Sequence, residues 1–417
     1  MDKKEVLVYF SDCPFFAGCE NMIPNFLNSK EINNSYEVYF LYRKSDAYSI
    51  ELKNRLLNSN LNCIALNLPN YNIHKSLLSG IKNIPILYKL FAALIIFVMK
   101  YFTIFNCIPI LYKKFKKLNI DILHINNGGY PAAFTAYSAV IAARLSGVNK
   151  IIYVVNNIAQ NYTSPLRWFD KIIDIYMKNK VSFFVTGSIN AGEKLKSTLK
   201  LSNNKVVNIP NGVKIRDITL SRLELLNELG LDLKNRSLFS TIALLEERKG
   251  HIWLLKAIKK LKETNIDKET FPFFIFEGDG STFSMLNNYI KENKLENYVK
   301  IIKKIPNIFN LINASDAIIL PSIFMEDFPN VIIEAMSLGK PVIGTKIAGI
   351  PEQIDHNKNG CLIKPKDSDD LYDSIIHLMN KDVRETYGIQ SKHKYNENYK
   401  VEISVNKYIQ LYKSINK

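Results

Sequence analysis

A chain of 417 residues is too long for one ordinary hydrophobic core, so its length predicts two domains. Its 47% hydrophobic content is that of a globular protein, and no repeat or low-complexity tract appears, which excludes disordered and repeat proteins. The net charge of +16 suggests an anionic partner, but no nucleic-acid-binding motif accompanies it, so nucleic acid is not the expected partner.

The cysteines and the amino terminus indicate a cytoplasmic protein. The five cysteines are scattered, odd in number and form no Cys-x-x-Cys pair, which argues against both a disulfide framework and a zinc site. The first apolar run is short and is interrupted by Asp12, so it predicts a buried strand and not a signal peptide.

Apolar runs of strand length alternate with helical stretches along the whole chain. The strands predicted in the first half are residues 6–10, 36–41, 63–68, 122–126, 151–155, 182–186 and 206–209. Those predicted in the second half are residues 238–244, 273–276, 299–302, 317–320, 342–344 and 361–363. The intervening helices include residues 132–146, 189–199, 251–264 and 369–379. This alternation predicts an α/β protein with two Rossmann-like, doubly wound domains that face each other across a cleft.

The connector between the two halves is expected at residues 209–213, Ile-Pro-Asn-Gly-Val, where Asn-Gly supplies a turn. The domains are therefore predicted at residues 1–210 and 211–395. In sheets of this kind ligands bind beyond the carboxyl ends of the strands. Loops that follow predicted strands are thus the places to look for a site.

A basic and apolar segment stands out in the first half. Between Glu51 and Asp121 the chain has lysines and an arginine but no acidic residue, and residues 84–112 are strongly apolar and aromatic. Lys89 and Lys100 divide this tract into runs shorter than the roughly 20 residues that span a bilayer. We expect residues 53–117 to lie along an anionic membrane surface. The alternative is a buried core helix whose lysines extend to water.

Two glutamates in the second half are the leading site candidates. Glu326 lies in the loop after the strand predicted at 317–320, and Glu334 lies in the early turns of a helix that Pro329 begins and Gly339 ends. Backbone N–H groups at that helix start, around residues 328–331, would attract phosphate. The alternative is a solvated loop glutamate and a helix-start glutamate favoured by the helix dipole.

Three other loops carry weaker signals. Lys249, followed by Gly250, could reach a diphosphate from the loop after strand 238–244, although such a lysine is usually solvated. Residues 276–281, Phe-Glu-Gly-Asp-Gly-Ser, lack the third glycine of a dinucleotide fingerprint, which argues against a nicotinamide cofactor. Residues 367–369, Asp-Ser-Asp, resemble the metal-binding DxD of some transferases, but they precede a helix and are expected to be its N-cap.

In this order the motifs resemble the nucleotide-sugar domain of retaining GT-B glycosyltransferases, glycosyltransferase group 1 (family 4-like). The matching residues, within about 205–380, are 248–251 (Arg-Lys-Gly-His), 277–280 (Glu-Gly-Asp-Gly), 315–316, 321–322, 326–336, 339–343 and 349–352. Residues 17–20, Ala-Gly-Cys-Glu, stand where the family usually has Gly-Gly-x-Glu. Residues 399–415 resemble the family's last helix, so residues 396–417 are expected to cross back onto the first domain.

The resemblance implies transfer of a sugar with retention, from a nucleotide-diphosphate sugar, without a cofactor or a divalent metal. The second domain would bind this donor and the first domain the acceptor, a glycan of bacterial-type surface polysaccharide, lipopolysaccharide or capsule. The basic, acid-free segment at 53–117 adds the expectation that this acceptor is lipid-linked. The protein would then be cytoplasmic and peripheral on the inner face of the plasma membrane. The implied binding residues are Glu334 for the ribose, Lys249 for the diphosphate, Gly18 near the phosphates, and Glu326, Phe328, Pro329, Asn330 and Val331 for the sugar.

The chain departs from the family in two places. Many members have Gly-Arg-Leu where this chain has Ala-Leu-Leu at 243–245, so Arg248 either replaces that arginine at the diphosphate or is a surface charge. Many members also have a histidine near the reacting sugar, where Asn156 or Asn157 stands here. His124 and the loop at 126–131 are further candidates, although a single histidine at a strand end is usually structural.

Two other functions remain possible. An epimerase-like nucleotide-sugar enzyme would need a nicotinamide fingerprint after the first strand, and residues 10–18 lack one. A catalytically inactive scaffold could have kept the fold, since a fold does not prove an activity. The donor sugar, its base, the acceptor, the linkage and the oligomeric state stay open.

Overall fold

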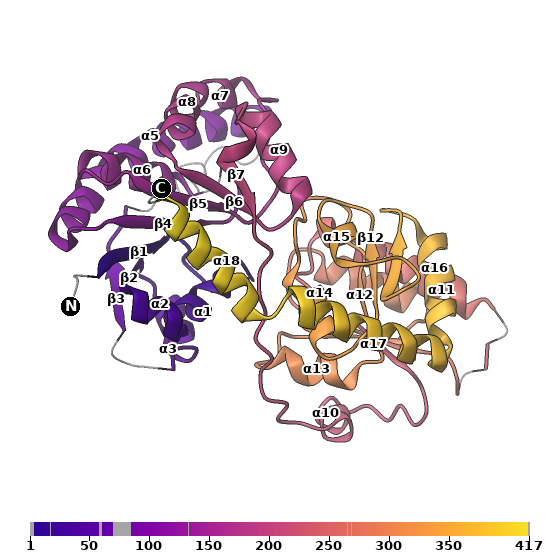
Figure 1. Ribbon diagram of the computed structural model, residues 1–417. Helices are drawn as coiled ribbons and strands as arrows, with labels where there is room; N and C mark the ends of the chain where they lie inside the picture. Colours follow the sequence, from indigo (N-terminus) through magenta and orange to yellow (C-terminus); the bar gives the residue numbers. More distant parts are fainter. Residues whose placement is uncertain are drawn as a thin grey trace. The chain divides into compact units, whose positions relative to one another are not determined.

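The computed structural model describes residues 4–415, except residues 17, 58–60, 70–84, 132, 265 and 268. The chain forms two compact units (Figure 1). Unit 1 comprises Met1–Ile209 together with Val405–Lys417, and unit 2 comprises Pro210–Ser404. Each unit has its own parallel sheet.

The sheet of unit 1 has seven strands in the order β3-β2-β1-β4-β5-β6-β7. They are β1 (Glu5–Ser11), β2 (Tyr36–Arg43), β3 (Asn62–Leu66), β4 (Ile122–Asn127), β5 (Lys150–Val155), β6 (Phe183–Thr186) and β7 (Val206–Asn208). All pairs are parallel, and β1 meets β4 with Leu7 opposite Ile122. Because strand order reverses between β1 and β4, the carboxyl ends of these two strands flank the topological switch point, where open α/β sheets bind ligands.

Helices cover both faces of this sheet. One face carries α5 (Pro85–Leu118), α6 (Phe134–Leu145), α8 (Lys171–Lys180) and α9 (Ile189–Leu199), with the four-residue α7 (Pro165–Trp168) ahead of α8 (Figure 1). The other face carries α1 (Met22–Asn28), α3 (Asp46–Lys53) and α18 (Val401–Ser414), whose aromatic side chains contact those of the sheet. The described part of unit 1 also has the short elements η1 (Gly18–Glu20), α2 (Lys30–Ser35) and η4 (Asn203–Lys205).

The carboxyl-terminal helix α18 is held in unit 1 by an aromatic cluster around His124. The His124 ring is fully buried, its Nδ1 lies 2.7 Å from the Tyr412 hydroxyl, and it packs against Tyr9, Phe26 and Tyr408. Burial lowers the pKa of His124 to about 3, so the ring is neutral. His124 is therefore a structural residue that anchors α18, as a single histidine in a strand often is.

The sheet of unit 2 has six parallel strands in the order β10-β9-β8-β11-β12-β13. They are β8 (Leu238–Ile242), β9 (Phe273–Glu277), β10 (Val299–Ile302), β11 (Ala317–Leu320), β12 (Val342–Thr345) and β13 (Gly360–Ile363). A buried apolar cluster lies on each face of this sheet. One cluster packs the sheet against α10 (Arg222–Glu228), α13 (Ile308–Ala314), α14 (Asn330–Ser337) and α15 (Ile350–Gln353). The other packs it against α11 (His251–Lys262), α12 (Phe283–Glu292), α16 (Ser368–Met379) and α17 (Lys381–Asn398). The thirteen strands confirm the alternation read from the sequence.

From residue 85 on, the tract at 84–112 lies in one helix, α5, which continues through Pro109 to Leu118. Two details differ from the sequence-based prediction. Strand β8 ends at Ile242, so residues 243–245 lie in the loop that follows it and not in the strand. The loop at 126–131 starts inside β4, because Asn126 and Asn127 still pair with β5. Asp367 is the N-cap of α16, as predicted, and accepts from the N–H groups of Asp369 and Asp370.

Candidate functional site

The candidate residues of unit 2 come from loops at the carboxyl edge of its sheet. Lys249 ends the short helix η5 (Glu247–Lys249) after β8, and Glu326 lies in the loop after β11. Strands β8 and β11 are neighbours, with Ala317 opposite Phe239, and the strand order reverses between them. Two loops that are 77 residues apart in sequence therefore meet at the switch point of this sheet.

Lys249 and Glu326 form an ion pair, with each side chain only 11% exposed. The Lys249 ammonium contacts Oε2 of Glu326, and the Ser322 hydroxyl donates to the same oxygen at 2.9 Å. Arg248 Nη1 lies 3.8 Å from it. Oε1 of Glu326 receives no hydrogen bond from the described residues. The carboxylate is thus fixed through one oxygen while the other remains able to accept from a hydroxyl group.

Backbone geometry holds these loops in contact. Gly250 has a φ of +71°, and a Cβ there would collide with the carbonyl oxygen of Pro321 at the end of β11. The Ile323 N–H donates to the Arg248 carbonyl at 2.7 Å, which joins the loops directly. Met325, just before Glu326, has a φ of +52°, a left-handed conformation that costs energy for a residue with a side chain. Such strain is typical of segments that place a functional side chain.

The helix after Glu326 begins as the sequence predicts. Pro329 is the N-cap of α14, Asn330 is its first residue, and Gly339 follows its end with a φ of +66°. Glu334 is the fifth residue of α14 and is buried. The N–H groups of a helix's first turn have no partner inside the helix and carry partial positive charge. The loop of Glu326 thus leads directly into a helix start suited to an anion.

The remaining predicted residues of this loop have structural contacts. Phe328 is buried and packs edge-on against Tyr399, with ring centroids 5.7 Å apart. Asn330 Oδ1 accepts from Asn211 Nδ2 at 3.1 Å, and Val331 packs against the core of unit 2. These contacts hold the backbone of residues 328–331, which is the part predicted to face a sugar.

One residue that the sequence reasoning did not assign stabilises the neighbouring loop. Glu277, at the end of β9, is buried and accepts from the Ile305 N–H at 3.0 Å. Burial raises the pKa of Glu277. Glu277 thus holds the loop after β10 by its backbone. In the sequence, Glu277 could have been singled out because it directly follows a predicted strand and is followed by Gly-Asp-Gly.

In unit 1 a buried polar network lies at the switch point between β1 and β4. Glu20 is buried and accepts from the hydroxyls of Ser11 at 2.9 Å and of Tyr48, and from Asn126 Nδ2 at 2.9 Å. Burial raises the pKa of Glu20, against the effect of these hydrogen bonds. Asn126 Oδ1 in turn accepts from Asn156 Nδ2 at 2.9 Å. The sequence had suggested Glu20 only as part of a loop motif, so this network is a finding of the structure.

The network orients Asn156. Its Nδ2 donates to Asn126 Oδ1 and to the Asn127 carbonyl, both at 2.9 Å, so both amide hydrogens are used. Its carbonyl oxygen accepts no hydrogen bond from the described residues. Asn157 Oδ1 accepts from the Ile158 N–H at 2.7 Å, within its own loop. At Gly18, in η1, an added Cβ would have no atom within 4 Å, so the backbone there is open to a ligand.

Comparison with known proteins identifies the domain that carries Lys249 and Glu326. Residues 226–400 match the family of group 1 glycosyl transferases. The second unit is a group 1 glycosyltransferase domain. The UDP-Gal:alpha-D-GlcNAc-diphosphoundecaprenol alpha-1,3-galactosyltransferase of Escherichia coli is 27% identical over 66% of this chain and 72% of its own length. The N-acetyl-alpha-D-glucosaminyl L-malate synthase of Bacillus anthracis is 29% identical over 39% of this chain, which spans only 44% of that enzyme.

Solved structures extend the likeness to the whole chain. A glycosyltransferase of Rickettsia africae superposes with a TM-score of 0.74 at 19% identity, covering 99% of both chains. Alr3699/HepE of Anabaena, solved with UDP, superposes with a TM-score of 0.75 at 16% identity, covering 98% of this chain and 100% of that one. At these identities the likeness shows the fold, which is the GT-B glycosyltransferase fold that the sequence predicts.

The departure of the glycosyltransferase domain from the family's Gly-Arg-Leu pattern has a visible consequence. Leu244 stands where many members have the arginine, and it is exposed in the loop after β8. Arg248 pairs with Glu246 at 2.7 Å and lies 3.4 Å from the Met325 carbonyl. Its guanidinium therefore belongs to the same loop contact as Lys249.

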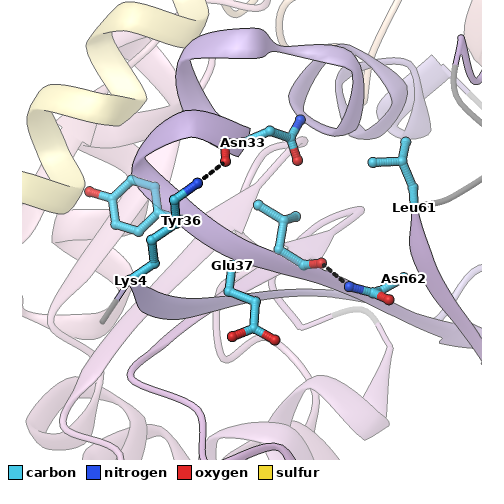
Figure 2. Close-up of a pocket in the computed structure, with 7 residues that line it drawn as sticks. Lys4, Asn33, Tyr36, Glu37, Leu61 and Asn62 are labelled. Carbon is cyan, nitrogen blue, oxygen red and sulfur yellow. Dashed lines mark hydrogen bonds between the residues drawn. The ribbon is translucent and has the colours of Figure 1, made fainter. Parts of the chain in front are cut away.

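A separate pocket of about 440 Å³ lies at the opposite, amino-terminal edge of the unit 1 sheet. Figure 2 shows Lys4, Tyr36, Glu37 and Asn62 around it, with Lys4 Nζ donating to the Asn33 carbonyl at 2.9 Å. Because ligands of such sheets bind at the carboxyl ends of the strands, this pocket is not part of the candidate site.

Proposed function

We propose that the protein transfers a sugar, with retention of configuration, from a nucleotide-diphosphate sugar to a lipid-linked glycan. The observation that carries the proposal is the Lys249–Glu326 ion pair at the carboxyl edge of β8 and β11, in the loop that leads into α14. A cation, a carboxylate with an open oxygen and a helix start are the groups that bind the diphosphate and the hydroxyls of such a donor.

Each group has a part in the transfer. Lys249 and the first turn of α14 stabilise the negative charge that grows on the departing diphosphate. Glu326 accepts from a hydroxyl of the sugar through Oε1, and Glu334 binds the ribose. The acceptor hydroxyl attacks the anomeric carbon from the face that the diphosphate leaves. The carbon–oxygen bond to the diphosphate breaks, the glycosidic bond forms, and a diphosphate oxygen takes the acceptor's proton.

We propose that side-chain cations, without a divalent ion or a cofactor, neutralise the diphosphate. Lys249 supplies this charge and Arg248 supports it from the same loop. In the Asp-Ser-Asp stretch that resembles a metal motif, Asp367 is the N-cap of α16 and Asp369 lies in its first turn. From unit 1, the proposed contacts of the donor are Gly18 with the phosphates and Asn156, with its neighbour Asn157, with a sugar hydroxyl.

The names of relatives support the acceptor class. The E. coli relative is named for transfer to N-acetylglucosamine on diphosphoundecaprenol, and another E. coli relative, 29% identical over 35% of this chain, is named for colanic acid biosynthesis. We therefore propose a role in surface polysaccharide biosynthesis. We also propose that the protein is cytoplasmic and peripheral on the inner face of the plasma membrane; the proposed lipid of the acceptor and the basic, acid-free segment at 53–117 support this location.

The test measures donor binding and transfer separately. UDP should bind the full chain in calorimetry with EDTA present. Lys249→Ala should weaken UDP binding about tenfold or more, because a hydrogen bond to a charged group contributes about 1.5–3 kcal/mol. Lys259→Ala, on the exposed side of α11, is the matched control. Glu334→Gln should also weaken binding without unfolding the protein.

Transfer is then assayed with UDP-hexoses and a polyprenyl-diphosphate N-acetylglucosamine acceptor. Both Lys249→Ala and Glu334→Gln should abolish transfer, and near-normal turnover in both would refute the site. NMR of the anomeric proton in the product tests retention. UDP binding without transfer to any acceptor would favour the inactive scaffold.

A further inference from the structure

Helix α5 has a buried inner face that makes it part of the core of unit 1. Ile104, Cys107, Leu111 and Phe115 are at most 1% exposed and pack in the cluster shared with α6, α8 and α9. The Ser138 hydroxyl of α6 donates to the Ile104 carbonyl at 2.9 Å. By length and composition alone, Phe91–Leu118 could cross a bilayer. Its packing against α6 rules that out for the folded unit, since a crossing helix would have to leave this core.

The outer face of α5 is also apolar. Phe91, Leu94, Val98, Phe102 and Phe105 follow one another at intervals of three, four or seven residues and are 49–66% exposed. With 3.6 residues per turn this spacing puts them on one side of the helix. Soluble proteins rarely leave a continuous apolar patch of this kind without a partner.

The same side of α5 becomes basic towards its end. Lys113, Lys116 and Lys117 are exposed, and the first two continue the line of Phe102 and Phe105. The helix contains no acidic residue. A flat helix of this composition would insert its apolar half between lipids while its lysines remain among anionic headgroups.

The segment of α7 and α8 adds a second apolar stripe. Trp168, Ile172 and Ile175 recur at intervals of four and three residues, and Ile172 is 81% exposed. Phe169 joins this segment to α5, because its ring lies 5.3 Å from that of Phe97. Lys171 is exposed beside Trp168. Trp and Lys side by side are typical of a membrane–water interface.

The acidic residues of this segment are withdrawn from the surface. Asp170 and Asp174 are buried, and Asp170 pairs with Lys100 of α5. Arg167 lies 3.0 Å from Asp170 and 2.6 Å from Asp174. The buried cluster fixes α7–α8 against α5 and leaves lysine as the exposed charge near both stripes. An anionic surface is therefore complementary to this face.

We propose that the outer faces of α5 and of the α7–α8 segment together dock on an anionic lipid bilayer, with α5 lying parallel to the membrane plane. This inference rests on the membrane location given under the proposed function and names the surface that makes the contact. It does not depend on the transfer chemistry. A second copy of the chain would bury the apolar stripes equally well, but it would place the lysines of both copies close together.

Trp168 provides a direct reporter, because the chain has only two tryptophans. In a Trp253→Phe background, emission of Trp168 should shift to shorter wavelength with vesicles of equal phosphatidylglycerol and phosphatidylcholine, and much less with phosphatidylcholine alone. In the Trp168→Phe protein, Trp253 of α11 should show no shift. A Trp168 spectrum unchanged by anionic vesicles would overturn the proposal.

Co-sedimentation with the same vesicles tests the face of α5. The pair Phe102→Ser and Phe105→Ser should weaken binding about tenfold or more, as expected when two aromatic side chains no longer leave water. The matched pair is Leu223→Ser and Ile389→Ser, at 69% and 68% exposure in unit 2, and it should bind as the unaltered protein does. Both pairs should keep UDP affinity, which separates this test from that of the proposed function.

Two results would contradict the docking face. Equal loss of vesicle binding in both pairs would show a general hydrophobic effect. A dimer in light scattering that Phe102→Ser and Phe105→Ser dissociate, in a protein without vesicle binding, would assign the face to self-association.

Discussion

At the candidate site, the hydrogen bonds that a side chain already makes determine its orientation. Glu326 is held through Oε2 and Asn156 through both hydrogens of Nδ2, so each presents a carbonyl or carboxylate oxygen. Glu326 was predicted from its loop after a strand, and Asn156 from its position where the resembled family has a histidine. The sequence could not predict which atoms remain open, because the partners Ser322 and Asn126 are selected by tertiary contacts.

His124 illustrates the same limit and leads to a prediction about pH. Burial lowers the pKa of His124 to about 3, and burial together with Lys249 lowers that of His251 to about 3. The unfolded chain has a histidine pKa near 6.5 and binds protons more readily, so the stability that these neutral rings contribute is complete above pH 6.5. It is lost as the pH falls towards 3, by at most about 1.4 kcal/mol per pH unit for each ring.

The measurement is the free energy of unfolding from urea titrations between pH 7.5 and 4.5. His124→Phe should be about 1 kcal/mol less stable at pH 7.5, because the contact with Tyr412 is lost. Its stability should fall less steeply with acid than that of the unaltered protein. Parallel curves would show that His124 does not take part in the acid transition.

At the scale of elements, hydrophobic periodicity predicted most strands and helices, and this also located the loops between them. In α5, lysines divide the apolar run of the sequence, although the helix is continuous. Lys100 is buried in the middle of the helix and pairs with Asp170, 70 residues away. In a sequence, a charged residue interrupts an apolar run, and nothing nearby shows that it can be buried. The packing of α7–α8 against α5 supplies the distant partner of Lys100.

The contact between the loops after β8 and β11 can be tested at Gly250. Gly250→Ala should disturb the Lys249 loop and weaken UDP binding, because the added methyl group would strike the Pro321 carbonyl. Gly230→Ala is the control, since Gly230 also has a positive φ, +63°, but open space around it. Both changes should cost about 1–2 kcal/mol of stability from the left-handed backbone.

Calorimetry with UDP and thermal unfolding distinguish the two variants. Gly250→Ala should lose more stability than Gly230→Ala, and only Gly250→Ala should lose UDP affinity. An unchanged affinity in Gly250→Ala would mean that the loop contact does not position Lys249 for the nucleotide.

At the scale of the whole molecule, the two units differ in their charge and in the functions that we assign to them. The excess of basic over acidic residues lies mainly in the first 200 residues, which contain α5, whereas the glycosyltransferase domain is at 226–400. The chain returns to unit 1 through Val405–Lys417. We infer that membrane contact belongs to unit 1 and donor binding to unit 2.

Replacing Lys113, Lys114, Lys116 and Lys117 by glutamine should therefore release the protein from anionic vesicles. Each lysine near such a surface contributes about 1 kcal/mol, and the binding that remains should depend less on salt. Co-sedimentation at increasing salt measures this. The same protein should bind UDP normally, and unchanged vesicle binding would refute the role of these lysines.

Local pattern alone determined the α/β class, the two sheets, the loops around Lys249 and Glu326 and the helix that carries Glu334, because strand and helix periodicity and turn residues act over a few neighbouring positions. Tertiary structure decided the ion pair of Lys249 with Glu326, the network of Glu20 and Asn156, the burial of His124 and the single helix α5. Each of these joins residues far apart in the chain, and only the packing of the sheet and its helices brings them within bonding distance.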